Sequence, residues 1–281
     1  ARLVLCPGGK SYPRTGTTGD GYRWLADLGL PIVEPVPALV PLSSPAEWVR
    51  ELSGIAVQVV EARLVDATKR VFGRRARPVL FTHRGISGPG AMDLSIDVAR
   101  AQALAQQRGE PTPAFALELD LVPSLSREEL RALLIESAGR NGAPSLVRVL
   151  PVDLPKRLIA AVARAADVAG ADPRVNGLDK AARHRLVETL KGLPVPIDGT
   201  LGFGLAEVTA GGLALSHVDP GTMRVRGFEN LTGSRHVGRL GQIAHRPQRI
   251  SANFASVELG NSVLAKQSGQ LGSGAIFGRT H

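Results

Sequence analysis

The chain contains one cysteine, few aromatic residues and no long apolar run. A single cysteine in 281 residues, Cys6, excludes an internal disulfide framework and a cluster of thiolate metal ligands. Aromatic residues make up 4% of the chain and hydrophobic residues 43%, so the core must be mainly aliphatic. No run approaches the roughly 18 apolar residues that cross a membrane, and no secretory signal pattern begins the chain. These absences predict a cytoplasmic protein without a membrane partner.

Several catalytic and metal-binding patterns are also missing. The sequence has no Cys-x-x-Cys, no paired histidine ligands and no Gly-x-Ser-x-Gly, and its six histidines are scattered. We therefore expect no metal site, and the catalytic residues stay unassigned.

Positive charge is concentrated at the C-terminal end. The formal net charge is +9, of which residues 224–281 carry +6 and the rest of the chain +3. Because the excess lies outside the expected globular body, nucleic acid is not favoured as a partner, and we expect a small-molecule substrate. Residues 224–281 also lack apolar periodicity, which predicts an irregular tail.

The first thirty residues carry the strongest local pattern. A short apolar run at residues 3–5 fits a buried strand, and a glycine-rich loop follows it. A helix is expected from Tyr22 to Leu28, with Gly29 as its stop. Strand, glycine loop and helix start together are typical of nucleotide and flavin sites. Asp20 there suits either helix capping or a hydrogen bond to a ribose or flavin.

The sequence of this loop offers two other interpretations. Gly8-Gly9-Lys10-Ser11 looks like the end of a P-loop, but Val4 stands where that motif needs glycine. Tyr12-Pro13 follows where the motif needs a helix, so we reject it. A purely structural turn remains an alternative.

The middle of the chain changes from strand to helix periodicity. Residues 46–125 contain short alternating apolar segments, which predict a β-rich module. Residues 126–196 read as a helical module, opened by a capping box of Ser126 and Glu129. Further helices are expected from Asp153-x-Pro155 and from Asp179 to Gly192. The Pro194-Val195-Pro196 segment is expected to be the linker that leaves this module.

A second candidate site lies at residues 80–90. A strand ending in Thr82-His83 is followed by Gly85, Ser87 and Gly88 and by a proline suited to a helix start. One imidazole, one hydroxyl and several N–H groups could bind an anionic or carbonyl group there. Alternatively, His83 and Ser87 only cap the turn. Residues 209–212 are similarly ambiguous, since two glycines after a strand can cradle a cofactor or form a β-bulge.

Four motifs together resemble a known family. They are Gly-Gly-Lys-Ser-Tyr-Pro-x-Thr-Gly-x-Thr-Gly-Asp-Gly-Tyr at 8–22, Leu-Phe-Thr-His-Arg-Gly-Ile-Ser-Gly-Pro at 80–89, Leu-Pro-Lys-Arg-Leu at 154–158 and Ala-Glu-Val-Thr-Ala-Gly-Gly at 206–212. In this order they resemble the bacterial FAD-dependent oxidoreductases of the BaiN and aminoacetone-oxidase type, over about residues 1–223. The family's Gly-x-Gly-x-x-Gly unit has no counterpart in this chain, and residues 224–281 do not match the family's final segment.

The resemblance implies a multidomain α/β and α+β fold. An incomplete, Rossmann-like FAD-binding domain (residues 1–45 and 197–223) would receive an inserted β-barrel-like module (46–125) and a helical module (126–196), with an aberrant tail (224–281). It implies that FAD lies near Gly8, Gly9, Thr18, Gly19, Asp20, Gly21, Thr209, Gly211 and Gly212. It further implies that a loop containing Thr82, His83, Gly85, Ser87 and Gly88 faces the flavin or its substrate.

The function implied is hydride transfer between a small organic substrate and flavin, with NAD(P)H as a candidate reductant in the parent enzyme. We expect this chain alone, as a fragment, to be inactive and to bind FAD weakly. The alternative is a non-catalytic basic module whose tail contacts nucleic acid or acidic partners.

Overall fold

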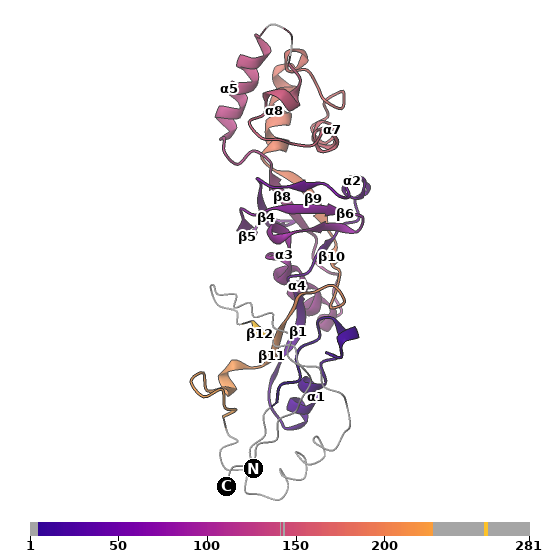
Figure 1. The fold of residues 1–281 in the computed structure, drawn as a ribbon, viewed down its shortest axis with the longest axis vertical. Helices are drawn as coiled ribbons and strands as arrows, with labels where there is room; N and C mark the ends of the chain where they lie inside the picture. The colour runs from indigo at the N-terminus through magenta and orange to yellow at the C-terminus, as the bar shows by residue number, and fades with distance from the viewer. Residues whose placement is uncertain (1–4, 141, 143, 227–255, 258–281) are drawn as a thin grey trace, which may run out of the picture. The chain divides into compact units, whose positions relative to one another are not determined.

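The computed structural model describes residues 5–140, 142, 144–226 and 256–257. Contacts within the chain divide it into two compact units, unit 1 (Ala1–Val40 with Gly202–His281) and unit 2 (Pro41–Leu201). The described residues form three sheets and eight α-helices, a mixed α/β fold (Figure 1). The expected mixture of helix and sheet is therefore confirmed, while the incomplete Rossmann-like domain stays a prediction.

Unit 1 is built on a long antiparallel pair of strands. Strand β1 pairs with β11, and β11 pairs in parallel with β12, giving the order β1-β11-β12. The register shifts between Val33 and Val36, on either side of a proline that cannot donate to a neighbouring strand. The elements of this unit are η1 (Pro13–Thr15), α1 (Asp20–Asp27), β1 (Ile32–Ala38), β11 (Val208–Leu213), η3 (Leu215–His217) and β12 (Ser256–Val257).

Unit 2 contains two antiparallel sheets with the orders β10-β2-β7-β6-β3 and β5-β4-β8-β9. Their strands are β2 (Leu42–Ser43), β3 (Ala56–Val57), β4 (Glu61–Asp66), β5 (Val71–Arg75), β6 (Val79–Thr82), β7 (Gly85–Ser87), β8 (Phe115–Asp120), β9 (Leu193–Ile197) and β10 (Gly199–Thr200). Three helices belong to this part: α2 (Glu47–Glu51), α3 (Pro89–Met92) and α4 (Ser95–Arg108).

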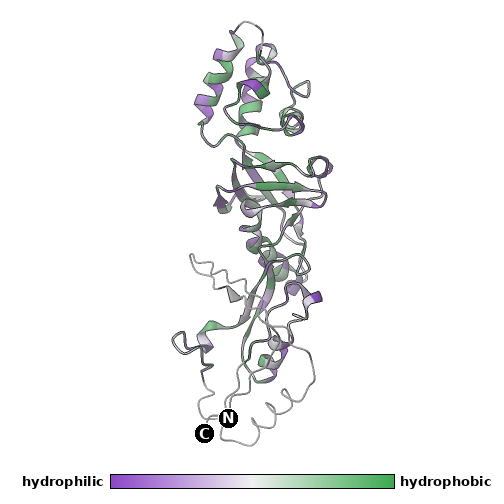
Figure 2. Ribbon diagram, in the orientation of Figure 1, coloured by the Kyte–Doolittle hydropathy of each residue, from purple (hydrophilic) through white to green (hydrophobic). Residues whose placement is uncertain are grey.

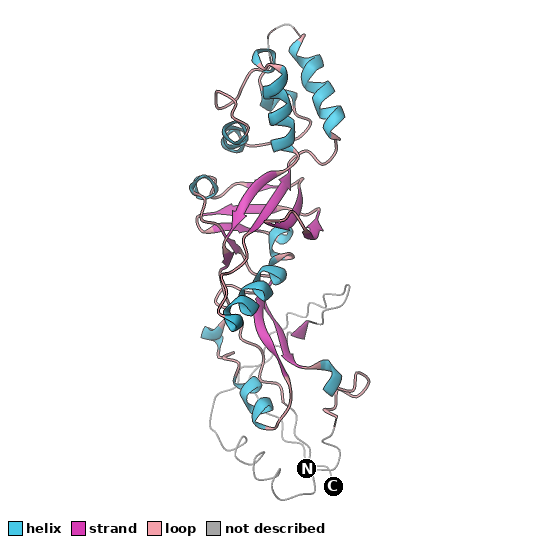
Figure 3. Cartoon of the chain, turned by 180° about the vertical axis from the view of Figure 1, so that it is seen from behind, coloured by secondary structure: helices cyan, strands magenta, loops and turns pink. Residues whose placement is uncertain are grey.

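The remaining helices of unit 2 gather beyond one end of these strands, as Figure 3 shows. They are α5 (Arg127–Ala138), α6 (Leu146–Val149), α7 (Lys156–Ala165), η2 (Val175–Gly177) and α8 (Lys180–Leu190). Polar residues fix where two of them begin. The Ser126–Glu129 capping box opens α5 as expected, and the Asp179 carboxylate accepts from the Ala182 N–H at the start of α8.

One aliphatic core joins the sheets and helices of unit 2. Phe81, Leu117, Leu158 and Leu186 are fully buried members of the same cluster. Figure 2 shows the apolar residues alternating along the strands and following one stripe of the helices, the pattern that one-sided burial requires. Among the described residues, no helix has the length and apolarity to cross a membrane.

The structure corrects three local expectations. Residues 194–196 are not a linker, because they lie in β9, which pairs with β8 and buries Val195. Prolines fit there since β9 is an edge strand and Pro194 and Pro196 point to solvent. Helix α7 begins after Pro155, so Asp153 is not its cap. The module expected to be β-rich also contains the 14-residue helix α4.

A further expectation concerns the chain's start. The expected strand at residues 3–5 falls mostly outside the described residues, and Leu5 itself is not in a strand. Helix α1 forms as expected and is followed by Gly29 at φ +80°, a conformation that favours glycine. The expectation for the tail also lies largely outside the described residues.

Candidate functional site

The glycine loop of unit 1 is held by one buried threonine. Thr209 lies in β11, is 2% exposed, and its hydroxyl accepts hydrogen bonds from the backbone N–H groups of Lys10 (2.8 Å) and Ser11 (3.1 Å). The Ser11 hydroxyl lies 3.1 Å from the same oxygen. These contacts join two segments about two hundred residues apart in the sequence, so the structure brings Gly9 and Thr209 together.

A second buried threonine shapes the turn that follows. Thr17 is 1% exposed, and its hydroxyl donates to the carbonyl oxygens of Ser11 and Tyr12. Tyr12 adopts φ +53° and donates its N–H to the Phe203 carbonyl at 3.1 Å. The loop is therefore fixed by hydrogen bonds at both ends, although the sequence did not identify Thr17 as a site residue.

Helix α1 begins with an uncapped first turn. Its N-cap residue, Gly19, has φ +82° and no side chain to satisfy the N–H groups of that turn. The Thr18 hydroxyl donates to the Asp20 carboxylate at 2.7 Å, and Arg23 approaches the same carboxylate at 3.5 Å. Thr18 is exposed and Asp20 half-buried, so both side chains can contact a ligand at the start of the helix.

Several glycines of the loop are required by the chain's own packing. A Cβ atom on Gly9 would lie 2.6 Å from the Thr209 hydroxyl, and one on Gly19 would lie 2.7 Å from Lys10 Cγ. Gly21 packs against the Pro7 ring, and a Cβ on Gly211 would lie 2.6 Å from a carbonyl oxygen of β1. These glycines therefore do not by themselves indicate a ligand.

Tyr22 connects the helix to the strand. A Cβ on Gly212 would lie 2.8 Å from Tyr22 Cε1, and one on Gly9 would lie 3.4 Å from its hydroxyl oxygen. Burial raises the pKa of the Tyr22 phenol, so the side chain stays protonated and can donate a hydrogen bond. The structure thus brings together Gly9, Thr209, Gly212 and the start of α1, with Tyr22 between them.

One buried donor of α1 lacks an acceptor. Trp24 is 7% exposed, and its Nε1 has no hydrogen-bond partner in the described part of the chain. In the loop before this helix, Lys10 makes a cation–π contact, with its Nζ atom 5.0 Å from the centre of the Phe203 ring.

The second predicted site is a hairpin in unit 2. His83 and Arg84 form the exposed turn between β6 and β7, and the Thr82 hydroxyl donates to the Gly85 carbonyl at 3.2 Å. Gly85 has φ +146° and packs against the backbone of β2. Thr82 therefore closes the turn, while the imidazole of His83 extends from it.

Ser87 and Gly88 lie at a different junction of the same hairpin. They lead into α3, where Pro89 occupies the first turn as expected. The Ser87 hydroxyl contacts Met92 Sδ at 3.4 Å. The structure consequently separates His83, in the turn, from the N–H groups at the start of this short helix.

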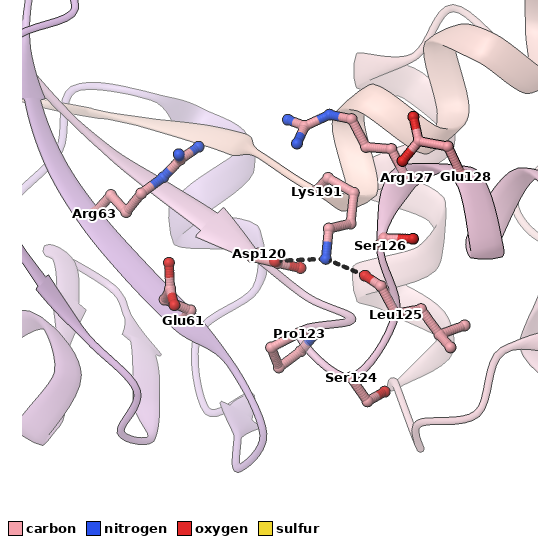
Figure 4. Close-up of a pocket in the computed structure, with 10 residues that line it drawn as sticks. All are labelled: Glu61, Arg63, Asp120, Pro123, Ser124, Leu125, Ser126, Arg127, Glu128 and Lys191. Carbon is pink, nitrogen blue, oxygen red and sulfur yellow. Dashed lines mark hydrogen bonds and ion pairs between the residues drawn. The ribbon is translucent and has the colours of Figure 1, made fainter.

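A charged pocket of about 400 Å³ lies between β4, β8 and the start of α5 (Figure 4). Its lining includes Glu61, Arg63, Asp120, Arg127 and Lys191. The Lys191 ammonium is 2.7 Å from the Asp120 carboxylate and also donates to the carbonyls of residues 122 and 125. Such a charged lining does not fit a planar, largely apolar flavin ring. The sequence did not indicate this pocket, because its residues come from three separate segments.

No group of three or more histidine, cysteine, aspartate or glutamate side chains could hold a metal ion among the described residues.

The comparisons agree with the architecture. Residues 36–208 match the family model described as HI0933-like protein barrel and H2TH domain. The chain is 29% identical over 225 residues to the "Ribosomal RNA dihydrouridine synthase" of Escherichia coli, covering 80% of this chain and 51% of that protein. It is 29% identical over 224 residues to the protein of the same name in Haemophilus influenzae, covering 79% and 50%.

A third relative carries a different name. The "3-dehydro-bile acid delta(4,6)-reductase" of Clostridium scindens is 24% identical over 230 residues, covering 82% of this chain and 54% of that protein. The chain thus spans about half the length of the curated relatives it matches. The family and the reductase support a relation to flavin-dependent oxidoreductases, whereas the narrower BaiN and aminoacetone-oxidase assignment stays a prediction.

The family model covers well over half of the chain and all of unit 2, with its two sheets and its helices. This chain belongs to the HI0933-like barrel and H2TH domain family.

Proposed function

We propose that this chain forms part of a flavin-dependent reductase that reduces a carbon–carbon double bond of a uracil base in RNA. The observation that carries the proposal is the 225-residue match to a ribosomal RNA dihydrouridine synthase, which includes residues of both units. Dihydrouridine is uridine with its ring double bond reduced, and the bile-acid relative is also named as a reductase. The names of both relatives thus describe a reduction.

The start of α1 fits the polar part of a flavin nucleotide. Its first turn has no side-chain cap, so the N–H groups there suit a phosphate or ribityl oxygen. Thr18 and Asp20 offer a hydroxyl and a carboxylate for sugar hydroxyls, and Arg23 limits the negative charge of that carboxylate. We propose FAD as the flavin and these residues, with Gly8 and Gly9, as part of its site.

The chain's residues would hold and orient the cofactor. The Thr209 hydroxyl fixes Lys10 and Ser11, and through them the loop that approaches the helix start. Tyr22 and Gly212 keep the helix against β11. A bound reduced flavin would supply the hydride, and a proton would complete reduction of the double bond. NAD(P)H remains the proposed source of reducing equivalents.

A second candidate is reduction of a small organic substrate. The bile-acid relative favours it, because its name specifies a small molecule. In that case we propose that the exposed His83 turn contacts the substrate, as the resemblance implies.

The test uses the complete gene that contains this coding sequence. Expressed in Escherichia coli without its own ribosomal RNA dihydrouridine synthase, the gene should restore dihydrouridine in digested ribosomal RNA, measured by mass spectrometry. The purified protein should carry flavin, seen in its visible absorbance. Flavin without dihydrouridine would refute the RNA substrate and favour the second candidate, while a protein without flavin would refute both.

A matched pair of variants tests the residues of the cofactor site. Asp20→Asn should weaken flavin retention, because it removes the carboxylate at the start of α1. Asp27→Asn makes the same chemical change at the other end of this helix and should leave retention unchanged. Equal flavin retention in the two variants would show that Asp20 does not contact the flavin.

A further inference from the structure

Five exposed cations lie close together on one hairpin of unit 2. They are Lys69, Arg70, Arg74, Arg75 and Arg77, all within nine residues that contain no acidic residue. We name them the β5 cluster, since β5 carries two of them and the others flank it. The summed charge of the chain obscures this cluster, because acidic residues elsewhere in unit 2 offset it.

The hairpin that carries the β5 cluster is firmly anchored. Strand β5 is an edge of its sheet and pairs only with β4 in the described sheet (Figure 1). Phe72 packs edge-on against Phe115 at 5.3 Å between ring centres, and the Arg70 guanidinium lies 5.1 Å from the Phe72 ring centre. The cations are therefore presented on a fixed support, at a hydrophilic end of the sheet in Figure 2.

Nearby carboxylates neutralise only part of the β5 cluster. Asp93 binds Arg77 at 2.7 Å and Arg75 at 3.6 Å, so one carboxylate serves two guanidinium groups. Glu118 is shared in the same way by Lys69 at 2.9 Å and Arg63 at 3.0 Å.

The third nearby carboxylate is committed to its own turn. Asp66 accepts from Thr68 and from the Arg70 N–H. Asp97 is a fourth carboxylate near the cluster, since it interacts electrostatically with Arg75. With Arg63 included, six cations face four carboxylates, and no ion pair of Arg74 with a carboxylate is found among the described residues. The surface therefore keeps a local positive excess.

We propose that the β5 cluster binds the phosphate backbone of the RNA on which this protein acts. The choice of RNA as the ligand rests on the proposed function, whereas the positive surface itself is observed in the structure. Four of the five cations are arginines, whose planar guanidinium groups match phosphate oxygens in pairs. Contacts of this kind position a nucleic acid without reading its sequence, so the β5 cluster holds the RNA while another part of the protein selects the base.

The test measures RNA binding by the full 281-residue chain. A labelled single-stranded fragment of ribosomal RNA is titrated at several salt concentrations. The variant combines Arg70→Gln, Arg74→Gln and Arg77→Gln. The matched control removes three exposed arginines elsewhere in unit 2, as Arg108→Gln, Arg148→Gln and Arg157→Gln. Both variants keep the basic C-terminal region and have the same net charge. Any difference in their RNA affinity therefore comes from where the replaced arginines lie.

The β5 variant should lose salt-dependent affinity. Each phosphate contact on single-stranded RNA contributes about 0.7 to the slope of log K against log salt. Three lost contacts should reduce that slope by about 2 and weaken binding roughly tenfold or more at low salt. The control variant should bind like the original chain.

Three results would overturn the proposal. They are equal losses in both variants, an unchanged salt slope in the β5 variant, and loss of binding to anionic lipid vesicles or an acidic polypeptide with RNA binding intact. If the triple variant fails to fold, Arg74→Gln alone should lower the slope by about 0.7. RNA binding is measured without flavin or turnover, so a negative binding result does not refute the proposed reductase activity. Equally, an enzyme found to contain no flavin would not refute RNA binding by the β5 cluster.

Discussion

Replacing Lys191 by methionine should destabilise unit 2 strongly. Lys191 is 7% exposed, and its ammonium contacts the Asp120 carboxylate at 2.7 Å (Figure 4). The ammonium also donates to the Val122 carbonyl at 2.9 Å. It also donates to the Leu125 carbonyl. A single ammonium group at the end of α8 therefore binds three acceptors in the segment that leads from β8 into α5.

The magnitude follows from what the substitution leaves behind. Methionine fills most of the volume but removes the ammonium from the Asp120 carboxylate and from two carbonyl oxygens. The Asp120 carboxylate then keeps the Val122 N–H as a donor but has lost its cation. Removing one partner of a buried ion pair costs about 3–5 kcal/mol. Asp120 borders the charged pocket and is 16% exposed, so water can reach it and the lower end of this range applies. We expect a loss of about 3 kcal/mol, or ~6–12 °C in melting temperature for a unit of this size.

Urea and thermal unfolding of the full chain measure this loss. Lys180→Met makes the same change at an exposed position at the start of α8 and should stay within about 0.5 kcal/mol of the original chain. The combination of Lys191→Met with Asp120→Asn should cost at least ~1 kcal/mol less than the sum of the single changes, because it also removes the unpaired charge. A Lys191→Met variant as stable as Lys180→Met would refute the reasoning.

Three further predictions follow from other sites. Thr209→Val should lower the stability of unit 1 by about 1–2 kcal/mol in thermal unfolding, because Lys10 and Ser11 lose their acceptor; Thr209→Ser should retain most of it, and equal losses would contradict this role. Burial raises the pKa of Asp97, so its ionised form destabilises the fold and stability is lost as pH rises through that pKa. Asp97→Asn should therefore melt higher than the original chain at pH 7, with a difference that narrows as pH falls; a pH-independent difference would refute this. In the complete enzyme, His83→Ala should lower turnover per folded molecule and leave the melting temperature nearly unchanged, because the side chain is exposed; the opposite pattern would assign it a structural role.

Local signals predicted the parts of the fold that depend on neighbouring residues. The Ser126–Glu129 capping box, the Asp179 cap and the glycine after α1 all act within one helical turn, so their effect is visible in the sequence. Strand β9 was mistaken for a linker because two prolines look like a break. Its place as an edge strand depends on β8, more than seventy residues earlier.

In the candidate site, too, the sequence predicted local features but not the contacts between distant residues. The sequence identified the glycine loop and Thr209, but their hydrogen bonds connect residues about two hundred positions apart and could not be derived from periodicity. Several glycines interpreted as room for a ligand are in contact with the chain itself, as Gly9 is with Thr209. The five cations of the β5 cluster lie within nine residues, but a charge summed over long segments hides them. The pocket around Lys191 could not be predicted in this way, because folding brings its distant segments together.

The prolines of β9 have a consequence for how molecules meet in solution. Leu193, Val195 and Ile197 are buried, while Pro194 and Pro196 alternate with them on the outer face. Because proline has no N–H, the donors of β9 serve β8, and its free edge offers carbonyl oxygens but no N–H at those two positions. A strand from a second molecule would find acceptors without matching donors and could not extend the sheet. At the opposite edge, the crowded guanidinium groups of β5 repel the same edge of another copy, so each side of this sheet resists self-association by a different means.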